Sequence, residues 1–238
     1  MASSFGTAPE RVICADQEGR WLICWAAARL APGLAPARWS PVGCAGGAEL
    51  DTIGPMARDV AGVAAGLALL EPGFSVDAAA ATRIGRIRPA GVDVDPVIDA
   101  AVDAALARCG VEVIDVDLPG WGSARRTWDV IIDAEAVVSN RALQARAEQE
   151  RWRAAMAVAL READLLALAT VPFFPPRLEA AVRRGYLGLT SPVNLAGFPA
   201  LALPVPTGQR LPASLQLIGG PNMEALLLAT GAMIEAAV

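Results

Sequence analysis

The sequence contains no lysine and no histidine, so all 20 of its basic side chains are arginines. Without histidine the chain has no Ser-His-Asp triad and no imidazole ligand for a metal ion. Without lysine it has no Schiff-base amine, no phosphate-loop lysine and no serine–lysine pair. Arginine does not replace lysine as a base, because the guanidinium keeps its proton near neutral pH. These two absences therefore exclude several classes of catalytic site.

Long apolar runs are also missing. The longest extends only from Val60 to Leu70 and lies between Asp59 and Glu71, which is too short to span a bilayer. The N-terminal residues include charges and no sustained apolar run, which argues against a signal peptide. The four cysteines show no CxxC spacing, a pattern typical of reduced thiols. The sequence therefore predicts a cytoplasmic protein with no membrane partner.

Positive charge is too scarce for a nucleic-acid surface. The formal net charge is −5 and no basic run occurs, so we expect no nucleic-acid partner. A content of 54% hydrophobic and 19% charged residues indicates a globular chain. Acidic residues alternate with valine over 93–95 and 115–117, but their spacing does not match a calcium loop. We interpret Asp95 as a helix cap and the others as a solvated strand edge, and we expect no metal and no cofactor.

The clearest local pattern is a strand–helix–strand unit. Ile84–Arg88 is the first strand, and Asp95-Pro96 opens a helix with a capping side chain and proline in its first turn. The apolar residues of that helix share one face, and Gly110 stands where a left-handed residue ends a helix. The second strand is Val111–Leu118. Short connections of this kind predict a parallel pair with a right-handed crossover.

Other expected elements follow from periodicity and from breakers. They are a helix over 56–70, a short helix over 22–30, two helices over 123–163 with a break near 140–144, a buried strand over 164–170, a helix opened by Pro192 and ended by Gly197, a strand over 201–205, a strand within 211–220, and a helix capped by Asn222.

Three stretches occur in an order that resembles a known family. They are LDTIGPMARDV from Leu50, TSPVNLAGFPA from Thr190 and LPASLQLIGG from Leu211. This ordered set is similar to the amidase-signature family, which includes bacterial amidases, the A subunit of the tRNA-dependent amidotransferase and fatty acid amide hydrolases. The resemblance covers residues 50–238, and we expect them to be the C-terminal portion of a single α/β domain. Residues 1–49 match poorly.

The resemblance implies a central mixed, largely parallel sheet with helices on both faces. It also implies hydrolysis or transfer at a carboxamide C–N bond, in which a lysine acts through one serine to activate another. This chain has no lysine, and no serine occurs between Ser4 and Ser40 where the nucleophile motif is expected. No catalytic residue is therefore assigned. We expect a chain truncated at the N-terminus relative to the family and inactive alone.

The family-motif residues are expected to be structural or pocket-lining. They are Asp51, Thr52, Gly54, Pro55, Arg58, Asn194, Gly197 and Gln216. The expected partners are a small-molecule amide, a second copy of the chain, or an N-terminal half. Two alternatives stay open: a non-catalytic amidase-like protein that binds a small molecule or a partner subunit, and a small-molecule-binding α/β domain without amidase ancestry.

Overall fold

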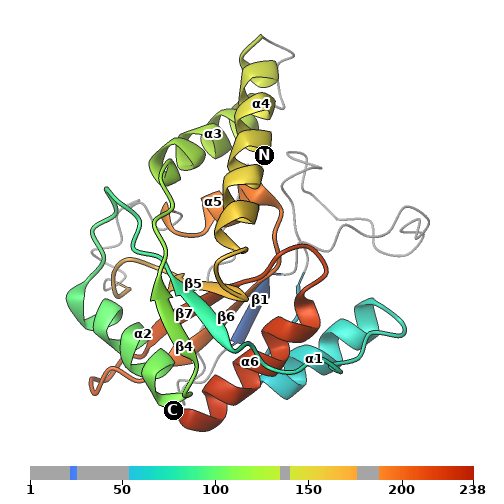
Figure 1. Cartoon of the computed structure of the whole chain (residues 1–238), viewed down its shortest axis with the longest axis vertical. Coiled ribbons are helices and arrows are strands. Elements are labelled where there is room, and N and C mark those ends of the chain that lie inside the picture. The colour runs from blue at the N-terminus through green and yellow to red at the C-terminus, as the bar shows by residue number, and fades with distance from the viewer. Residues whose placement is uncertain (1–21, 26–53, 135–139, 176–187) are drawn as a thin grey trace, which may run out of the picture.

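The computed structural model describes residues 22–25, 54–134, 140–175 and 188–238. One seven-stranded sheet organises this part of the chain, in the order β2-β1-β6-β7-β5-β3-β4 (Figure 1). In chain order the strands are β1 (Leu22–Trp25), β2 (Met56–Ala57), β3 (Arg83–Arg86), β4 (Glu112–Asp115), β5 (Leu165–Ala169), β6 (Ala200–Val205) and β7 (Ala213–Ile218). β1 lies between β2 and β6, so the N-terminal segment contributes a strand to the same sheet as the rest of the chain.

The sheet is mixed, as predicted, but it is not largely parallel. β3 pairs in parallel with β4 and with β5, whereas the other four pairings are antiparallel. β6 and β7 form a hairpin through the short loop 206–212, and a connection that short permits only an antiparallel pair.

The predicted strand–helix–strand unit is confirmed. α2 (Pro96–Arg108) connects β3 to β4, and Ile84 of β3 lies opposite Val113 of β4 in a parallel register. The Asp95 carboxylate accepts a hydrogen bond of 2.8 Å from the N–H of Val97 and so caps the helix. Gly110 has φ +72°, the left-handed conformation expected after the helix.

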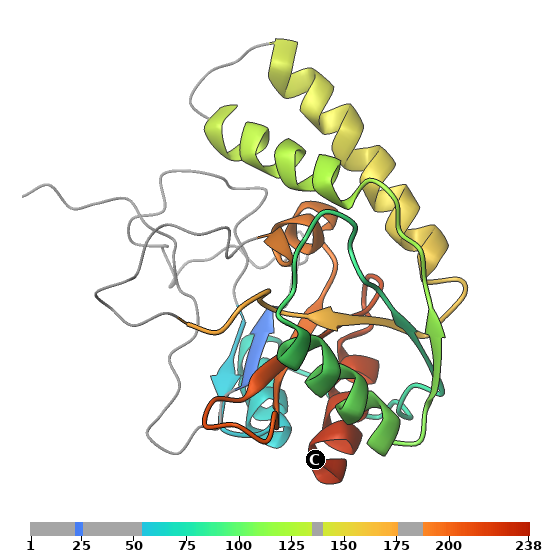
Figure 2. The ribbon, with the colours of Figure 1, turned by 90° about the vertical axis from the view of Figure 1, so that its left-hand side faces the viewer.

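The two faces of the sheet are covered by different helices. α1 (Val60–Leu70), α2 and α6 (Glu224–Ala237) pack on one face, and α3 (Trp121–Ala134), α4 (Asn140–Ala159) and α5 (Ser191–Ala196) lie on the other side (Figure 2). The α6 contact is close because Gly231 has no side chain. A Cβ at that position would lie 2.4 Å from Leu201 Cδ2 of β6.

Tertiary pairing overrides several local predictions. Met56 and Ala57 form β2 and the helix begins only at Val60, because this edge strand pairs with β1. Leu22–Trp25 is that partner strand and not a helix. Asn222 does not cap α6, whose N-cap is Met223 without a side-chain bond; Asn222 instead has φ +63° in the preceding turn.

The predicted break between the two helices falls a few residues too late, since α4 already begins at Asn140. The strand over 164–170, the short helix ended by Gly197 and the strands near 201–205 and 211–220 are confirmed as β5, α5, β6 and β7. None of the helices in the described ranges has the length and apolar character needed to cross a membrane.

Candidate functional site

The motif segment around α5 is a buried six-residue helix. Pro192 lies in its first turn, and Gly197 ends it with φ +67° and ψ +32°. The N–H of Gly197 donates to the carbonyl of Asn194 at 2.9 Å. Only a residue without a Cβ adopts this conformation cheaply, which explains a glycine here.

Side chains from α3 and α4 hold this segment in place. Each uses an N–H donor to bind an acceptor within residues 188–196. Three of these acceptors are main-chain carbonyls of α5 itself, and a helix this short leaves its last carbonyls without intrahelical partners. The five bonds are Trp121 Nε1 to Gly188 O (2.8 Å), Trp128 Nε1 to Asn194 Oδ1 (2.8 Å), Gln149 Nε2 to Leu195 O (3.0 Å), Trp152 Nε1 to Pro192 O (2.7 Å) and Arg153 Nε to Ala196 O (2.9 Å). We call this set the α5 clamp.

Two tryptophans of the α5 clamp also contact each other. The rings of Trp121 and Trp152 meet edge to face, with centroids 5.6 Å apart. Both tryptophans are almost fully buried. At the start of α5, the Ser191 hydroxyl is also buried, and no hydrogen-bond partner for it lies in the described part of the chain.

A cavity of about 250 Å³ lies at the carboxyl ends of the parallel strands β3 and β5. Leu168 and Ala169 of β5, the 86–94 segment and Leu189, which directly precedes the α5 segment, line it. In open α/β sheets, ligands bind outside the carboxyl ends of parallel strands where successive connections diverge. In the sheet, β4 and β5 lie on opposite sides of β3, so the connections that follow β3 and β4 run in opposite directions. The cavity therefore lies at a position where ligands bind in such sheets.

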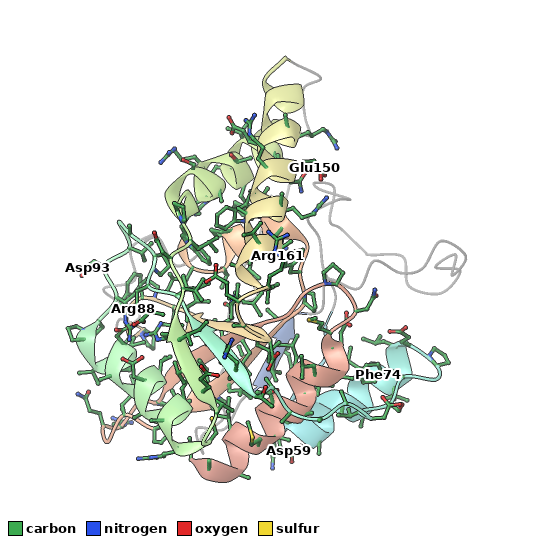
Figure 3. All side chains as sticks on the ribbon, viewed as in Figure 1. Asp59, Phe74, Arg88, Asp93, Glu150 and Arg161 are labelled. Atoms are coloured by element: carbon green, nitrogen blue, oxygen red, sulfur yellow. The ribbon has the colours of Figure 1, made fainter. Side chains whose placement is uncertain are left out.

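The two arginines of this cavity are already paired with carboxylates. Arg86 is 2% exposed and binds Asp99, Asp103 (2.8 Å) and the carbonyl of Ile87 (2.7 Å). Arg88, at the mouth beside Asp93 (Figure 3), binds Asp99, Asp103 and Asp115. Burial acts to lower the pKa of Arg88, but its bonds to Asp103 and Asp99 outweigh burial and raise that pKa. Each guanidinium nitrogen of this pair therefore already donates to an acceptor, and both positive charges are balanced by carboxylates.

A second, larger cavity of about 580 Å³ lies between α3 and α4, beside Pro119 and Gly120. Its lining combines apolar residues, among them three alanines and Trp152, with the polar side chains of Ser123, Arg126, Thr127, Glu148 and Arg151. Among the described residues, no three Asp, Glu or Cys side chains are grouped so as to hold a metal ion.

The predicted motif residues occupy different parts of the fold. Asn194 and Gly197 lie on α5, at the clamp. Pro55 packs against α1, where a Cβ at Gly66 would lie 2.5 Å from the proline ring, and Gly54 precedes it; Arg58 is exposed.

Gln216 lies at the centre of β7, is 3% exposed, and pairs with Ala202 and Leu168 on the neighbouring strands. Asp51 and Thr52 lie outside the described residues. Their expected structural or pocket-lining role therefore stays a prediction.

Sequence reasoning did not find the clamp residues on α3 and α4. Their partners are 40 to 67 residues away, and no local pattern specifies which acceptor a tryptophan or arginine will bind. One signal was available: this helical region holds Trp121, Trp128 and Trp152, half of the six tryptophans. Buried indoles need an acceptor for the ring N–H, which points to polar partners in the core.

Comparison with known proteins identifies the family to which this part of the chain is similar. Residues 123–228, which include most of α3 and all of α4, β5, α5, β6 and β7, match the family model described as Amidase. Over this C-terminal portion the chain belongs to the amidase-signature family.

The similar proteins extend this result. The chain is 31% identical over 240 residues to a 2-amino-5-chloromuconic acid deaminase of Comamonas testosteroni, covering 80% of this chain and 52% of that protein. It is 59% identical over 39 residues to one of the subunits of the glutamyl-tRNA(Gln) amidotransferase of Moorella thermoacetica, covering 16% of this chain and 8% of that protein. A crystal structure of an amidase superposes with a TM-score of 0.68 at 21% identity, covering 78% of this chain and 52% of that one.

At that identity the structural likeness shows the α/β fold and no more. The chain spans about half the length of the deaminase and of the amidase.

Proposed function

We propose that this chain is the C-terminal portion of an amidase-type enzyme, acting on a carboxamide C–N bond, and that it has no turnover alone. The observation that carries the proposal is the family match over 123–228 in a chain without a single lysine or histidine. The chemistry implied by the family needs a neutral amine base, and arginine cannot lose its proton near neutral pH.

The ion pairs of the β3–β5 cavity also support the proposal that this chain lacks the catalytic groups. Its two guanidinium groups are bound to carboxylates, so the described residues leave no spare cation there for a developing oxyanion. The base, the nucleophile and the oxyanion donors would therefore be supplied by residues outside this chain. The chain would supply the α5 segment and the walls around it.

An activity assay tests this proposal. Purified chain is incubated with simple aliphatic and aryl amides, alone and after addition of an N-terminal half from an amidase-signature enzyme. Loss of a whole catalytic unit typically costs on the order of 10⁴- to 10⁶-fold in rate, so we expect background rates from the chain alone. Turnover by the chain alone, retained after substitution of Ser3 and Ser4, contradicts the proposal.

A non-catalytic, partner-binding role is the second candidate, because one relative is part of a multi-subunit amidotransferase. The same experiment separates the two. Turnover restored by the N-terminal half favours the enzyme portion. Ligand-induced thermal stabilisation, with no turnover in either mixture, favours the binding role.

A further inference from the structure

The cavity between α3 and α4 has the dimensions and the lining of a small-molecule site. Its volume of about 580 Å³ falls in the range of ligand pockets, typically about 300–1,000 Å³. The two helices project together from the sheet, away from α1, α2 and α6 (Figure 2), and the cavity lies between them. We call it the α3–α4 groove.

The floor of the α3–α4 groove is apolar and held in position from below. Ala124 and Ala145 are buried, and Trp152 is 5% exposed. The Trp152 indole is fixed by its bond to Pro192 and by the edge contact with Trp121. A flat ring beside small side chains presents a preformed surface on which an apolar or aromatic body can lie without reorganisation.

The polar groups in the floor need no further partner. The Thr127 hydroxyl donates to Glu148 at 2.7 Å, which satisfies the buried hydroxyl and occupies one carboxylate oxygen. On the rim, Arg126 donates to the Ser123 hydroxyl at 2.9 Å and has no carboxylate partner within the described chain. Arg151 is 73% exposed, and its guanidinium lies 3.9 Å from Glu148.

Two other arginines of the same helices make an informative comparison. Arg125 is paired with Asp129 and lies over the Trp128 ring, and Arg153 binds Glu150 at 2.6 Å and the carbonyl of Ala196. Neither lines the α3–α4 groove. Of the two arginines that flank the apolar floor, Arg126 therefore has no carboxylate partner within the described residues, and Arg151 has only the long, exposed contact with Glu148.

We propose that the α3–α4 groove binds a small organic acid, with its apolar body on Trp152 and the alanines and its carboxylate between Arg126 and Arg151. Guanidinium groups bind carboxylates through charge-assisted hydrogen bonds, whereas the apolar floor favours a ring or alkyl chain over a bare inorganic anion. The proposal does not rest on the amide chemistry, because it concerns a different cavity and its readout is binding.

Isothermal titration calorimetry of the full chain tests it, with phenylacetate as the probe. Benzamide supplies a ring without charge, and inorganic phosphate supplies charge without a ring. We expect phenylacetate to bind at least about tenfold more tightly than either, and more weakly as salt is raised. Equal affinity for benzamide, equal affinity for phosphate, or no binding of phenylacetate at millimolar concentration overturns the proposal.

Variants locate the site. Arg126→Gln and Arg151→Gln should each weaken phenylacetate binding about tenfold, as loss of a charge-assisted hydrogen bond does. The matched control Arg125→Gln should leave it unchanged. Ala155→Leu should fill the groove and abolish binding, whereas Ala154→Leu, which does not line it, should not. If Ala155→Leu does not fold, the arginine variants decide, and wild-type affinity in Arg126→Gln/Arg151→Gln refutes the assignment.

Discussion

The indole Nε1 of Trp152 in α4 donates a hydrogen bond of 2.7 Å to the main-chain carbonyl of Pro192 in α5, 40 residues further along the chain. Both groups are buried, so neither can exchange this bond for one with water. Trp152→Phe keeps most of the ring packing but leaves that carbonyl without its donor. We expect a loss of about 1–3 kcal/mol in the free energy of unfolding, measured by denaturant titration. Val158→Ala, at an exposed position of the same helix, should change it far less.

Two glycine-to-alanine substitutions should change the stability of the fold in opposite directions. Gly231→Ala places a Cβ 2.4 Å from Leu201 Cδ2 at the contact of α6 with β6, so we expect destabilisation by about 1–3 kcal/mol. Gly122→Ala lies on the exposed side of α3 with its nearest neighbour at 3.7 Å. Because alanine favours a helix over glycine, it should stabilise by up to about 1 kcal/mol. Thermal unfolding of both variants checks this, and a neutral Gly231→Ala would mean that α6 can shift away from the sheet.

Removal of the carboxylates that bind the buried Arg86 should strongly lower the stability of the fold. Asp99→Ala/Asp103→Ala leaves the 2%-exposed guanidinium of Arg86 without a carboxylate, and breaking a buried pair in this way costs about 3–5 kcal/mol. The exposed pair of Arg83 and Glu112 is the control, because Arg83→Gln/Glu112→Gln should cost less than about 1 kcal/mol. Similar costs for the two double variants in urea unfolding would show that Arg86 reaches solvent.

Asp164 should make folding sensitive to acid. The N–H of Arg83 is the main cause that lowers the pKa of Asp164, helped by the N–H and hydroxyl of Thr82, while burial acts to raise it. A carboxylate with a lowered folded-state pKa stabilises the fold fully above its unfolded pKa of about 3.9. That stabilisation is lost as the pH falls through the folded-state pKa.

Asp164→Asn should therefore be less stable than wild type near neutral pH, and the gap should close on acidification below about pH 4. Burial raises the pKa of Glu224, which favours the fold at low pH in both proteins, so the difference between them isolates Asp164. Unfolding measured along a pH series checks this. A gap that stays constant with pH would contradict the role of the Asp164 charge.

The strand–helix–strand unit of β3, α2 and β4 could be predicted from the sequence because its signals are local. The Asp95 side chain caps α2 through the N–H of Val97, Pro96 begins the helix, and Gly110 follows its end. The same holds for α5, which Pro192 opens and Gly197 ends. In each case the free energy that selects the element comes from residues within one or two helical turns.

The amino-acid sequence also excludes lysine- and histidine-dependent chemistry without any coordinates, because neither residue type occurs in it. Packing of distant segments was needed to make Met56 and Ala57 a strand beside β1 and to make the sheet mostly antiparallel. Packing likewise brought four donors of α3 and α4 to the main chain around α5 and a fifth to the Asn194 side chain. These contacts join residues far apart in the chain. Their stability depends on burial and on acceptors that exist only once the sheet and the helices have packed.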